Sequence, residues 1–220
     1  MEYYHLHTKG IKDAFWKEKR EFIITDKFKN RLYDRTNNFT SILPINDLNI
    51  IYAMLEPELR DNFYRMFGNQ VNLEFLIHYC LENVVDKKVL KMLLELSKLQ
   101  TYNSGMFKRE LALENYRKDN FPNIPSRLHS LFVTTEDGIR FWQSRLIDSD
   151  LEVFKLDIMD EPFVTNESYL PYESLVYGDY YQAASGYWYP NLKKDNPLTR
   201  EYLVQGKVKI LEKVAEIQKK

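Results

Sequence analysis

Strand-forming segments lie at both ends of the chain and helix-forming segments lie between them, and this order restricts the fold more than any single motif. Residues 3–8 (YYHLHT) alternate aromatic or aliphatic side chains with histidines, and residues 151–159 (LEVFKLDIM) alternate over several positions. A period of two is typical of a strand with one buried face. We therefore predict a single α+β domain over residues 1–220, with a helical insertion at about residues 45–118.

The helical middle contains start and stop signals. Asp47 is a candidate N-cap, and Pro57 breaks or restarts the helix that follows it. Residues 71–99 predict one long or two short amphipathic helices, and residues 106–121 predict a further one. Two prolines after residue 121 end this helical region.

The C-terminal half mixes both kinds of element. Residues 130–135 (SLFVTT) have the composition of a strand, and residues 136–146 predict a helix after it. Residues 177–189 predict a helix or a loop that is rich in aromatic side chains. The tail at residues 211–220 has helical composition.

Residues 196–210 (NPLTREYLVQGKVKI) predict a strand with a carboxylate at its head. Because faces alternate along a strand, Glu201 shares a face with Leu203, while Tyr202 and Val204 point the other way. A carboxylate beside a core leucine is either a solvated strand end or a catalytic group held over a cleft. Both interpretations remain open from this pattern alone.

Composition excludes several classes of protein. The formal net charge is -1, so the chain carries no overall basic field for a nucleic acid or a membrane surface. Cys80 is the single cysteine, which rules out an internal disulfide and favours a reducing compartment. The N-terminal residues lack the apolar core of a signal peptide, and no apolar run approaches the roughly 20 residues of a spanning helix. We expect a cytoplasmic protein with no membrane partner.

Common catalytic and metal-binding motifs are missing from the sequence. It has no glycine-rich phosphate loop and no cysteine pair for zinc. His5 and His7 would share a strand face, but no third ligand stands at a telling spacing, so we predict no metal site. Carboxylate pairs leave a glycosidase-like hydrolase open as an alternative. The candidate carboxylates are Glu110, Glu114, Asp157, Asp160 and Glu161.

Three segments interleave basic and aromatic residues, namely residues 15–22, 27–33 and 106–110. Base stacking combined with phosphate contacts is how proteins bind single-stranded nucleic acid. Solvated faces with partly buried rings give the same pattern, so each segment alone is ambiguous.

Four blocks, taken in order, resemble the ADP-ribosyltransferase superfamily. They are residues 3–8, residues 125–142 (PSRLHSLFVTTEDGIRFW), residues 151–159 and residues 199–211 (TREYLVQGKVKIL). The last block is similar to the glutamate strand of bacterial toxins of this superfamily that modify DNA. Residues 183–189 (AASGYWY) are similar to the helix and aromatic loop that precede this strand in several bacterial members.

This resemblance implies a split β-sheet core and an enzyme that uses NAD as its substrate. Glu201 would be the catalytic carboxylate that stabilises the positive charge developing on the ribose. A histidine of the first block would contact the NAD, and serines of the second block would orient it. Arg127 has a guanidinium fork suited to the pyrophosphate, and aromatic rings would stack on the nicotinamide. The expected NAD-contacting residues are His5, His7, Ser126, Arg127, Ser130, Trp142, Tyr187 and Trp188.

The resemblance also implies a toxin or a defence effector, for example against viruses, that modifies a macromolecule. We favour a base of single-stranded RNA or DNA as the acceptor, with a protein acceptor as the alternative. The helical middle would then form part of the acceptor surface or bind an antitoxin-like protein partner. A non-catalytic binding module with a degenerate transferase fold is the rival hypothesis.

Overall fold

The computed structural model describes residues 1–10, 13–33, 55, 57–67, 73–82, 87–146, 150–170, 177–192 and 195–218. The chain divides into two compact units. Met1–Asp34 and Lys108–Lys220 form the first, which we call the sheet unit, and Arg35–Phe107 form the second, the helical unit. The N-cap predicted at Asp47 lies outside the described residues.

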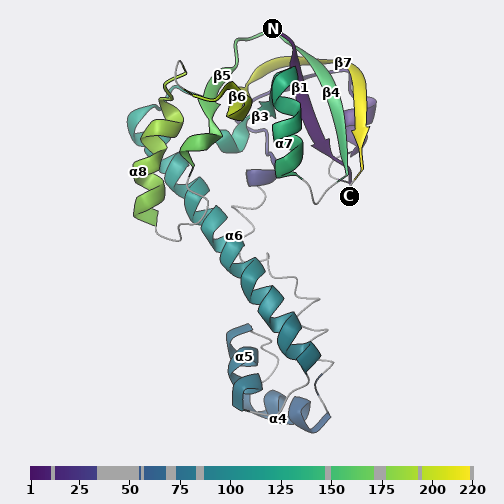
Figure 1. Cartoon of the computed structure of the whole chain (residues 1–220), viewed down its shortest axis with the longest axis vertical. Coiled ribbons are helices and arrows are strands. Elements are labelled where there is room, and N and C mark those ends of the chain that lie inside the picture. The colour runs from purple at the N-terminus through teal and green to yellow at the C-terminus, as the bar shows by residue number, and fades with distance from the viewer. Residues whose placement is uncertain are drawn as a thin grey trace. The chain divides into compact units, whose positions relative to one another are not determined.

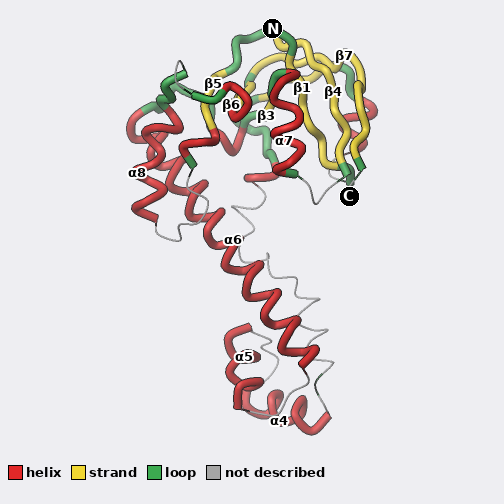
Figure 2. Tube along the Cα trace, in the orientation of Figure 1, coloured by secondary structure: helices red, strands yellow, loops and turns green. Residues whose placement is uncertain are grey.

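Two antiparallel sheets form the sheet unit (Figures 1 and 2). The first sheet has the strand order β1 (Tyr3–Thr8), β4 (Leu151–Ile158), β7 (Gly206–Ile217) and β2 (Glu21–Ile24). The second has the order β3 (Leu131–Val133), β6 (Arg200–Val204) and β5 (Phe163–Asn166). An antiparallel bridge between Tyr4 and Thr134 joins β1 to the end of β3 through two backbone hydrogen bonds of 2.8 Å each. The predicted α+β class with a central helical region is confirmed, and both sheets are antiparallel.

The two faces of β6 enter different cores, as the alternation predicts. Tyr202 and Val204 pack in a cluster that includes Trp16 of α1 (Asp13–Glu18). Leu203 packs on the opposite side in a cluster with Trp188. Both faces of this strand are therefore buried, and Glu201 lies on the same side as Leu203.

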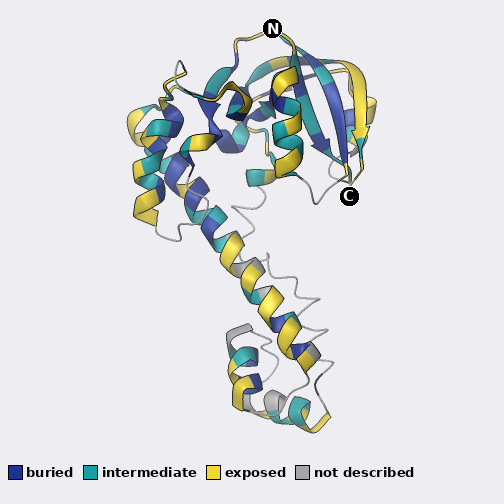
Figure 3. Ribbon diagram, viewed as in Figure 1, coloured by how far each residue is buried: buried dark blue, intermediate teal, exposed yellow. Residues whose placement is uncertain are grey.

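The remaining helices of the sheet unit are short, apart from the end of α6 (Lys87–Asn120). In Figure 1, α8 (Tyr177–Trp188) and the last turns of α6 lie beside the second sheet. The outer face of α8 is exposed, as is much of the second half of β7 (Figure 3). The other elements are α7 (Ile139–Arg145) and the 3-10 turns η2 (Arg127–His129), η3 (Glu136–Gly138), η4 (Glu167–Tyr169) and η5 (Pro197–Thr199).

The helical unit contains α4 (Pro57–Phe67), α5 (Leu73–Glu82) and the first part of α6. A helix begins at Pro57, which agrees with the predicted restart, because proline is favourable in the first helical turn. Cys80 is buried in the core of this unit beside Leu76 and Tyr79, where it packs as a small apolar residue. In the part of the chain that is described, no helix is long and apolar enough to cross a membrane.

Residues 106–120 are helical as predicted, but the prediction of a separate helix is wrong, because α6 continues without a break from Lys87 to Asn120. Gly105 lies inside this helix. A single glycine costs a helix only about 1 kcal/mol relative to alanine, so the good helix formers on both sides outweigh it.

The helical tail predicted at residues 211–220 is also wrong, because β7 extends to Ile217. Its residues pair with β4 from Leu151 to Ile158, with two shifts of register along the way. Long antiparallel pairing overrides a helical composition, since β-propensity depends strongly on tertiary context. Strand β5 had no predicted counterpart.

A glycine with positive φ, Gly206, starts β7, and its backbone φ is 95°. A Cβ atom at this position would lie 1.8 Å from Oδ2 of Asp160. We expect Gly206→Ala to lower the free energy of unfolding by about 1–2 kcal/mol, because this backbone conformation is strained for an L-residue. Urea denaturation would measure the change.

The matched control is Gly178→Ala in the first turn of α8, where a Cβ would meet no atom within 4 Å. This control should be neutral or slightly stabilising, since alanine favours a helix. Equal effects of the two substitutions would contradict the role assigned to Gly206.

Candidate functional site

A buried carboxylate at the head of β6 is the centre of the candidate site. Glu201 is buried and accepts two hydrogen bonds on one oxygen, Oε2. One comes from Nη1 of Arg127, and the other comes from the hydroxyl of Tyr187 at 2.5 Å. Nη1 of Arg127 also donates to the Tyr187 hydroxyl, so the three groups form a closed triangle. Both hydrogen bonds fall on Oε2, so Arg127 and Tyr187 do not use the other oxygen, Oε1.

A row of alternating charges extends from Glu201 into α6. Nε of Arg127 donates to Oε2 of Glu110 at 2.8 Å. Arg109 donates to the other oxygen of Glu110 from Nη2 at 2.8 Å and from Nε at 3.2 Å. All four side chains are buried, and their formal charges cancel. Buried charges are tolerated when they are paired and hydrogen-bonded in this way.

Aromatic rings restrict the central guanidinium of this row. The Arg127 guanidinium carbon lies 4.9 Å from the ring centroid of Phe132 and 5.0 Å from that of Tyr187. Phe132 belongs to β3, and Tyr187 belongs to α8. The two rings and the two carboxylates together limit Arg127 to one orientation, which fixes the direction of Glu201.

A second ion pair anchors the loop that carries Arg127. Glu114 accepts hydrogen bonds from Arg117 at 2.7 Å and 3.1 Å and from Ser126 at 2.8 Å. Ser126 is also the N-cap of η2, since its hydroxyl accepts from the backbone N–H of Leu128. This pair joins the end of α6 to the start of η2 and so positions Arg127.

Burial and neighbouring charges together set the protonation of the central groups. Burial and the charge of Glu201 raise the pKa of the Tyr187 hydroxyl well above its usual value, although Arg127 opposes this effect. Tyr187 therefore stays a hydrogen-bond donor at neutral pH. Burial alone would raise the pKa of Glu110, but Arg127 and Arg109 outweigh it and lower that pKa. Glu110 is therefore ionised at neutral pH.

A second carboxyl group, Glu167, lies near Glu201. Glu167 is the first residue of η4 and is buried. Its Oε1 lies 3.4 Å from Nε of Arg145. Burial and the negative charge of Glu201 raise the pKa of Glu167 from its ordinary value of 4.5 to about 7. A carboxyl group with this pKa can carry or release a proton near neutral pH.

Six of the predicted site residues gather around β6 with Glu201. They are Arg127, Tyr187, Ser126, Ser130, Trp142 and Trp188. The hydroxyl of Ser130 donates to the Ser126 carbonyl at 2.7 Å. Nε1 of Trp142 donates to the Arg200 carbonyl at 3.3 Å, and Nε1 of Trp188 donates to the Leu113 carbonyl at 2.8 Å. Ser130 and the two tryptophans therefore make contacts that support the strand and its neighbours.

The two histidines lie on β1 beside Trp16. The ring of His5 stacks on Trp16 with a centroid distance of 4.4 Å, and its Nδ1 lies 2.7 Å from the Phe132 carbonyl. Burial lowers the pKa of His5 to about 4, so the ring is neutral at pH 7. His7 is buried beside the same tryptophan. Tyr3, on their face of β1, contacts Tyr202, which points away from Glu201.

The carboxylates suggested by the hydrolase alternative divide into two groups. Glu110 and Glu114 are buried in the ion pairs described above. Asp160 and Glu161 are exposed in the connection between β4 and β5, and Asp157 is half-buried opposite Lys209. Glu167 had no sequence signal, because it lies in a single 3-10 turn that shows no periodicity. Among the described residues, no group of three His, Cys, Asp or Glu side chains is placed to hold a metal ion.

Comparison with known proteins gives one family. A family model described as "Protein of unknown function (DUF2441)" matches residues 3–216. No curated protein matches the chain.

Removing the central cation tests the charge row. Arg127→Met should lower the free energy of unfolding by about 3–5 kcal/mol, because Glu201 would lose its buried cation and Glu110 would keep only Arg109. Urea denaturation at pH 7 measures this. The control is Arg140→Met on the exposed face of α7, which should change stability by less than about 0.5 kcal/mol. A small loss for Arg127→Met would show that the row contributes little to stability.

The raised pKa of Glu167 predicts a pH dependence of stability. A group whose pKa is higher in the folded protein stabilises it at low pH, and this contribution is lost as the pH rises through about 7. Glu167→Gln keeps a neutral side chain, so its melting temperature relative to wild type should increase between about pH 5 and pH 8. Thermal melting at several pH values measures this trend. The exposed Glu161→Gln should show no such trend, and a flat difference for Glu167→Gln would refute the assignment.

Proposed function

The chain belongs to the DUF2441 family, and we propose that it is an NAD-dependent ADP-ribosyltransferase with Glu201 as its catalytic carboxylate. The observation that carries this proposal is the fixed orientation of Glu201 at the head of β6. Arg127 and Tyr187 occupy one oxygen of the carboxylate and leave the other for a ligand. A buried, rigidly held carboxylate is suited to stabilise a positive charge that develops on a sugar ring.

The arrangement of the strands supports the proposal. The four blocks that resemble the ADP-ribosyltransferase superfamily contain β1, β3, β4 and β6. These strands are consecutive neighbours in the order β6, β3, β1, β4, in which the Tyr4–Thr134 bridge connects the two sheets. Blocks that are far apart in the sequence therefore form one continuous series of hydrogen-bonded strands, which suits a split β-sheet core.

The chemistry follows from the charge that must be stabilised. Cleavage of the bond between nicotinamide and ribose passes through an oxocarbenium-like ribose, as in glycoside hydrolysis. Oε1 of Glu201 would accept a hydrogen bond from a ribose hydroxyl, and the carboxylate would stabilise the positive ring. Arg127 is engaged by two carboxylates, so within this proposal it orients Glu201 in place of the expected pyrophosphate contact. Tyr187 has the same orienting role.

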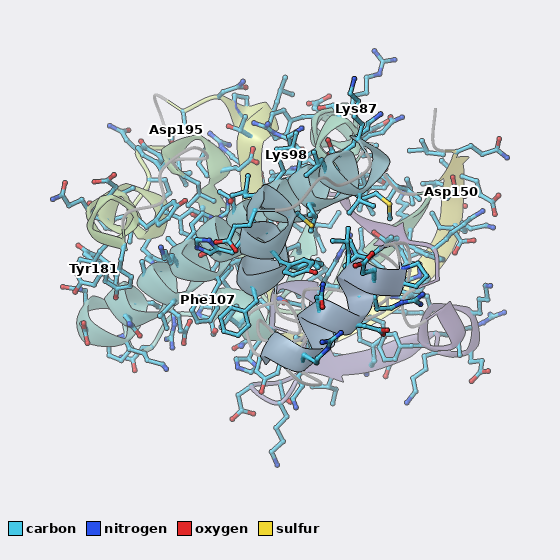
Figure 4. All side chains as sticks on the ribbon, turned by 90° about the horizontal axis from the view of Figure 1, so that it is seen from below. Lys87, Lys98, Phe107, Asp150, Tyr181 and Asp195 are labelled. Carbon is cyan, nitrogen blue, oxygen red and sulfur yellow. The ribbon has the colours of Figure 1, made fainter. Side chains whose placement is uncertain are left out.

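A row of aromatic rings supports a nucleic acid as the acceptor. The rings of Tyr177, Tyr181, Tyr116, Phe121 and Tyr189 contact one another in this order, with centroid distances of 5.1–6.4 Å. Tyr181 lies at the outer edge of the sheet unit (Figure 4), and Tyr189 is 80% exposed. Stacking on such rings is how bases of single-stranded nucleic acid are held. In the first basic segment, by contrast, Trp16 and Phe22 are core residues.

The proposal also includes a toxin or defence role, an antitoxin-like partner and, as the alternative acceptor, a protein. No residue is assigned to any of these three. A non-catalytic binding module is the second candidate, and one observation favours it. Glu201 is only 4% exposed and is paired with Arg127, as a purely structural ion pair would be.

One assay separates the two candidates. Purified protein is incubated with NAD labelled in the adenylate part, together with cellular RNA, DNA and protein. We expect label to move to one of these pools, most strongly to single-stranded nucleic acid. Glu201→Gln should reduce transfer by about 100-fold or more, because the amide cannot supply the negative charge. Nicotinamide release is measured in parallel.

The control variant is Glu161→Gln, which removes an exposed carboxylate and should retain full activity. The melting temperature of each variant shows whether it is folded. If folded wild type transfers no label and releases no nicotinamide, the transferase proposal fails and the binding module replaces it.

A further inference from the structure

We propose that Glu167 is the general base of the reaction, which takes the proton from the acceptor while Glu201 stabilises the ribose. This inference rests on the proposed transferase function. It divides the two roles that a single carboxylate would otherwise have to fill.

Strand register places both carboxylates on one face. Thr165 of β5 is directly opposite Glu201 of β6. Asn166, between Thr165 and Glu167, is extended, with φ of −142° and ψ of 124°. Glu167 therefore returns to the face of Thr165 and is the diagonal neighbour of Glu201. Residues at diagonal positions of an antiparallel pair are separated by about 7–8 Å, and long side chains such as those of two glutamates can approach each other across this distance.

Rigid elements hold Glu167 in this position. The preceding Asn166 is fixed by its side chain, whose Oδ1 accepts from the Ser168 backbone at 2.8 Å and from the Thr199 hydroxyl at 2.8 Å. The hydroxyl of Thr165 donates to the Tyr187 carbonyl, which ties β5 to α8. The direction of Glu167 is thus linked to the elements that orient Glu201.

Four charged groups act on Glu167 from the elements around it. They are Glu201 of β6, Arg145 of α7, Arg127 of η2 and Arg109 of α6. Burial and Glu201 disfavour the ionised form, whereas the three arginines favour it, and the balance raises the pKa to about 7. Of the three arginines, Arg145 has its Nε 3.4 Å from Oε1 of Glu167, and 46% of its side chain is exposed.

This environment suits a base better than that of Glu201. A general base is most effective when its pKa lies near the working pH. Glu201 is hydrogen-bonded to Arg127 and Tyr187, and these bonds hold its negative charge in place. Two neighbouring carboxyl groups in unlike environments commonly divide acid–base and charge-stabilising roles.

The proposed step balances as follows. The bond between the nicotinamide nitrogen and C1′ of the ribose breaks, and its electron pair leaves with neutral nicotinamide. A lone pair on a nitrogen or oxygen of the acceptor forms the new bond to C1′. The proton of that acceptor atom moves to the Glu167 carboxylate, which then releases it to water.

The test is the pH profile of transfer to the acceptor pool identified in the assay above. For wild type, we expect the rate to rise with pH and to level off above about 7, as Glu167 becomes ionised. Glu167→Gln should lower the rate by about 100-fold or more and remove this rise. NAD binding, measured by calorimetry, should remain within about threefold, since Glu167 is not assigned to NAD. Glu161→Gln is the matched control and should keep the wild-type profile.

Each outcome is decisive. If Glu167→Gln keeps the wild-type rate and profile while Glu201→Gln is inactive, the inference on Glu167 is overturned and the transferase proposal stands. If wild type shows no turnover, both fail. If Glu167→Gln does not fold, Glu167→Asp is used instead. It retains a carboxyl group in a different position, so an unchanged midpoint of the pH profile would overturn the inference, and a shifted midpoint with a reduced rate would support it.

Discussion

The guanidinium of Arg127 is the interaction on which the rest of the candidate site depends. It contacts Glu201 of β6 and Glu110 of α6, and it packs against the rings of Phe132 and Tyr187. These groups come from four elements, α6, β3, α8 and β6, at positions between residue 110 and residue 201. A buried cation that serves two carboxylates restricts every element around it, because any shift leaves a charge without its partner. The geometry of Glu201 is therefore a property of the whole second sheet and its helices.

The strands at the two ends of the chain could be predicted from the alternation of apolar and polar residues. That alternation also predicted the two faces of β6, because a strand has only two sides. The continuity of α6 and the extent of β7 could not be predicted from the sequence. Local composition favoured separate helices at residues 71–99 and 106–121 and a helical tail at residues 211–220, while the observed elements depend on neighbours and on pairing with β4.

Some residues of the candidate site could be identified in the sequence from their chemical type. Arg127, Tyr187 and Glu201 were singled out separately, and the fold brings them into direct contact. Glu167 was not found, because its position depends on the register between β5 and β6, whose paired residues are 36 apart at Thr165 and Glu201. The contact of His5 with NAD stays a prediction; in the structure its ring stacks on Trp16 and its Nδ1 lies 2.7 Å from the Phe132 carbonyl.

A single residue, Gln205, separates the end of β6 from the start of β7. The chain passes from the second sheet to the first at this point, and Gly206 supplies the turn. A connection this short acts as a rigid coupling between the two sheets. The head of β6 cannot slide independently of the larger sheet, so the position of the Glu201 backbone is fixed relative to both sheets. Under the proposed function, a ligand would therefore reach Glu201 through movement of the helices and turns around it, while the two sheets move as one body.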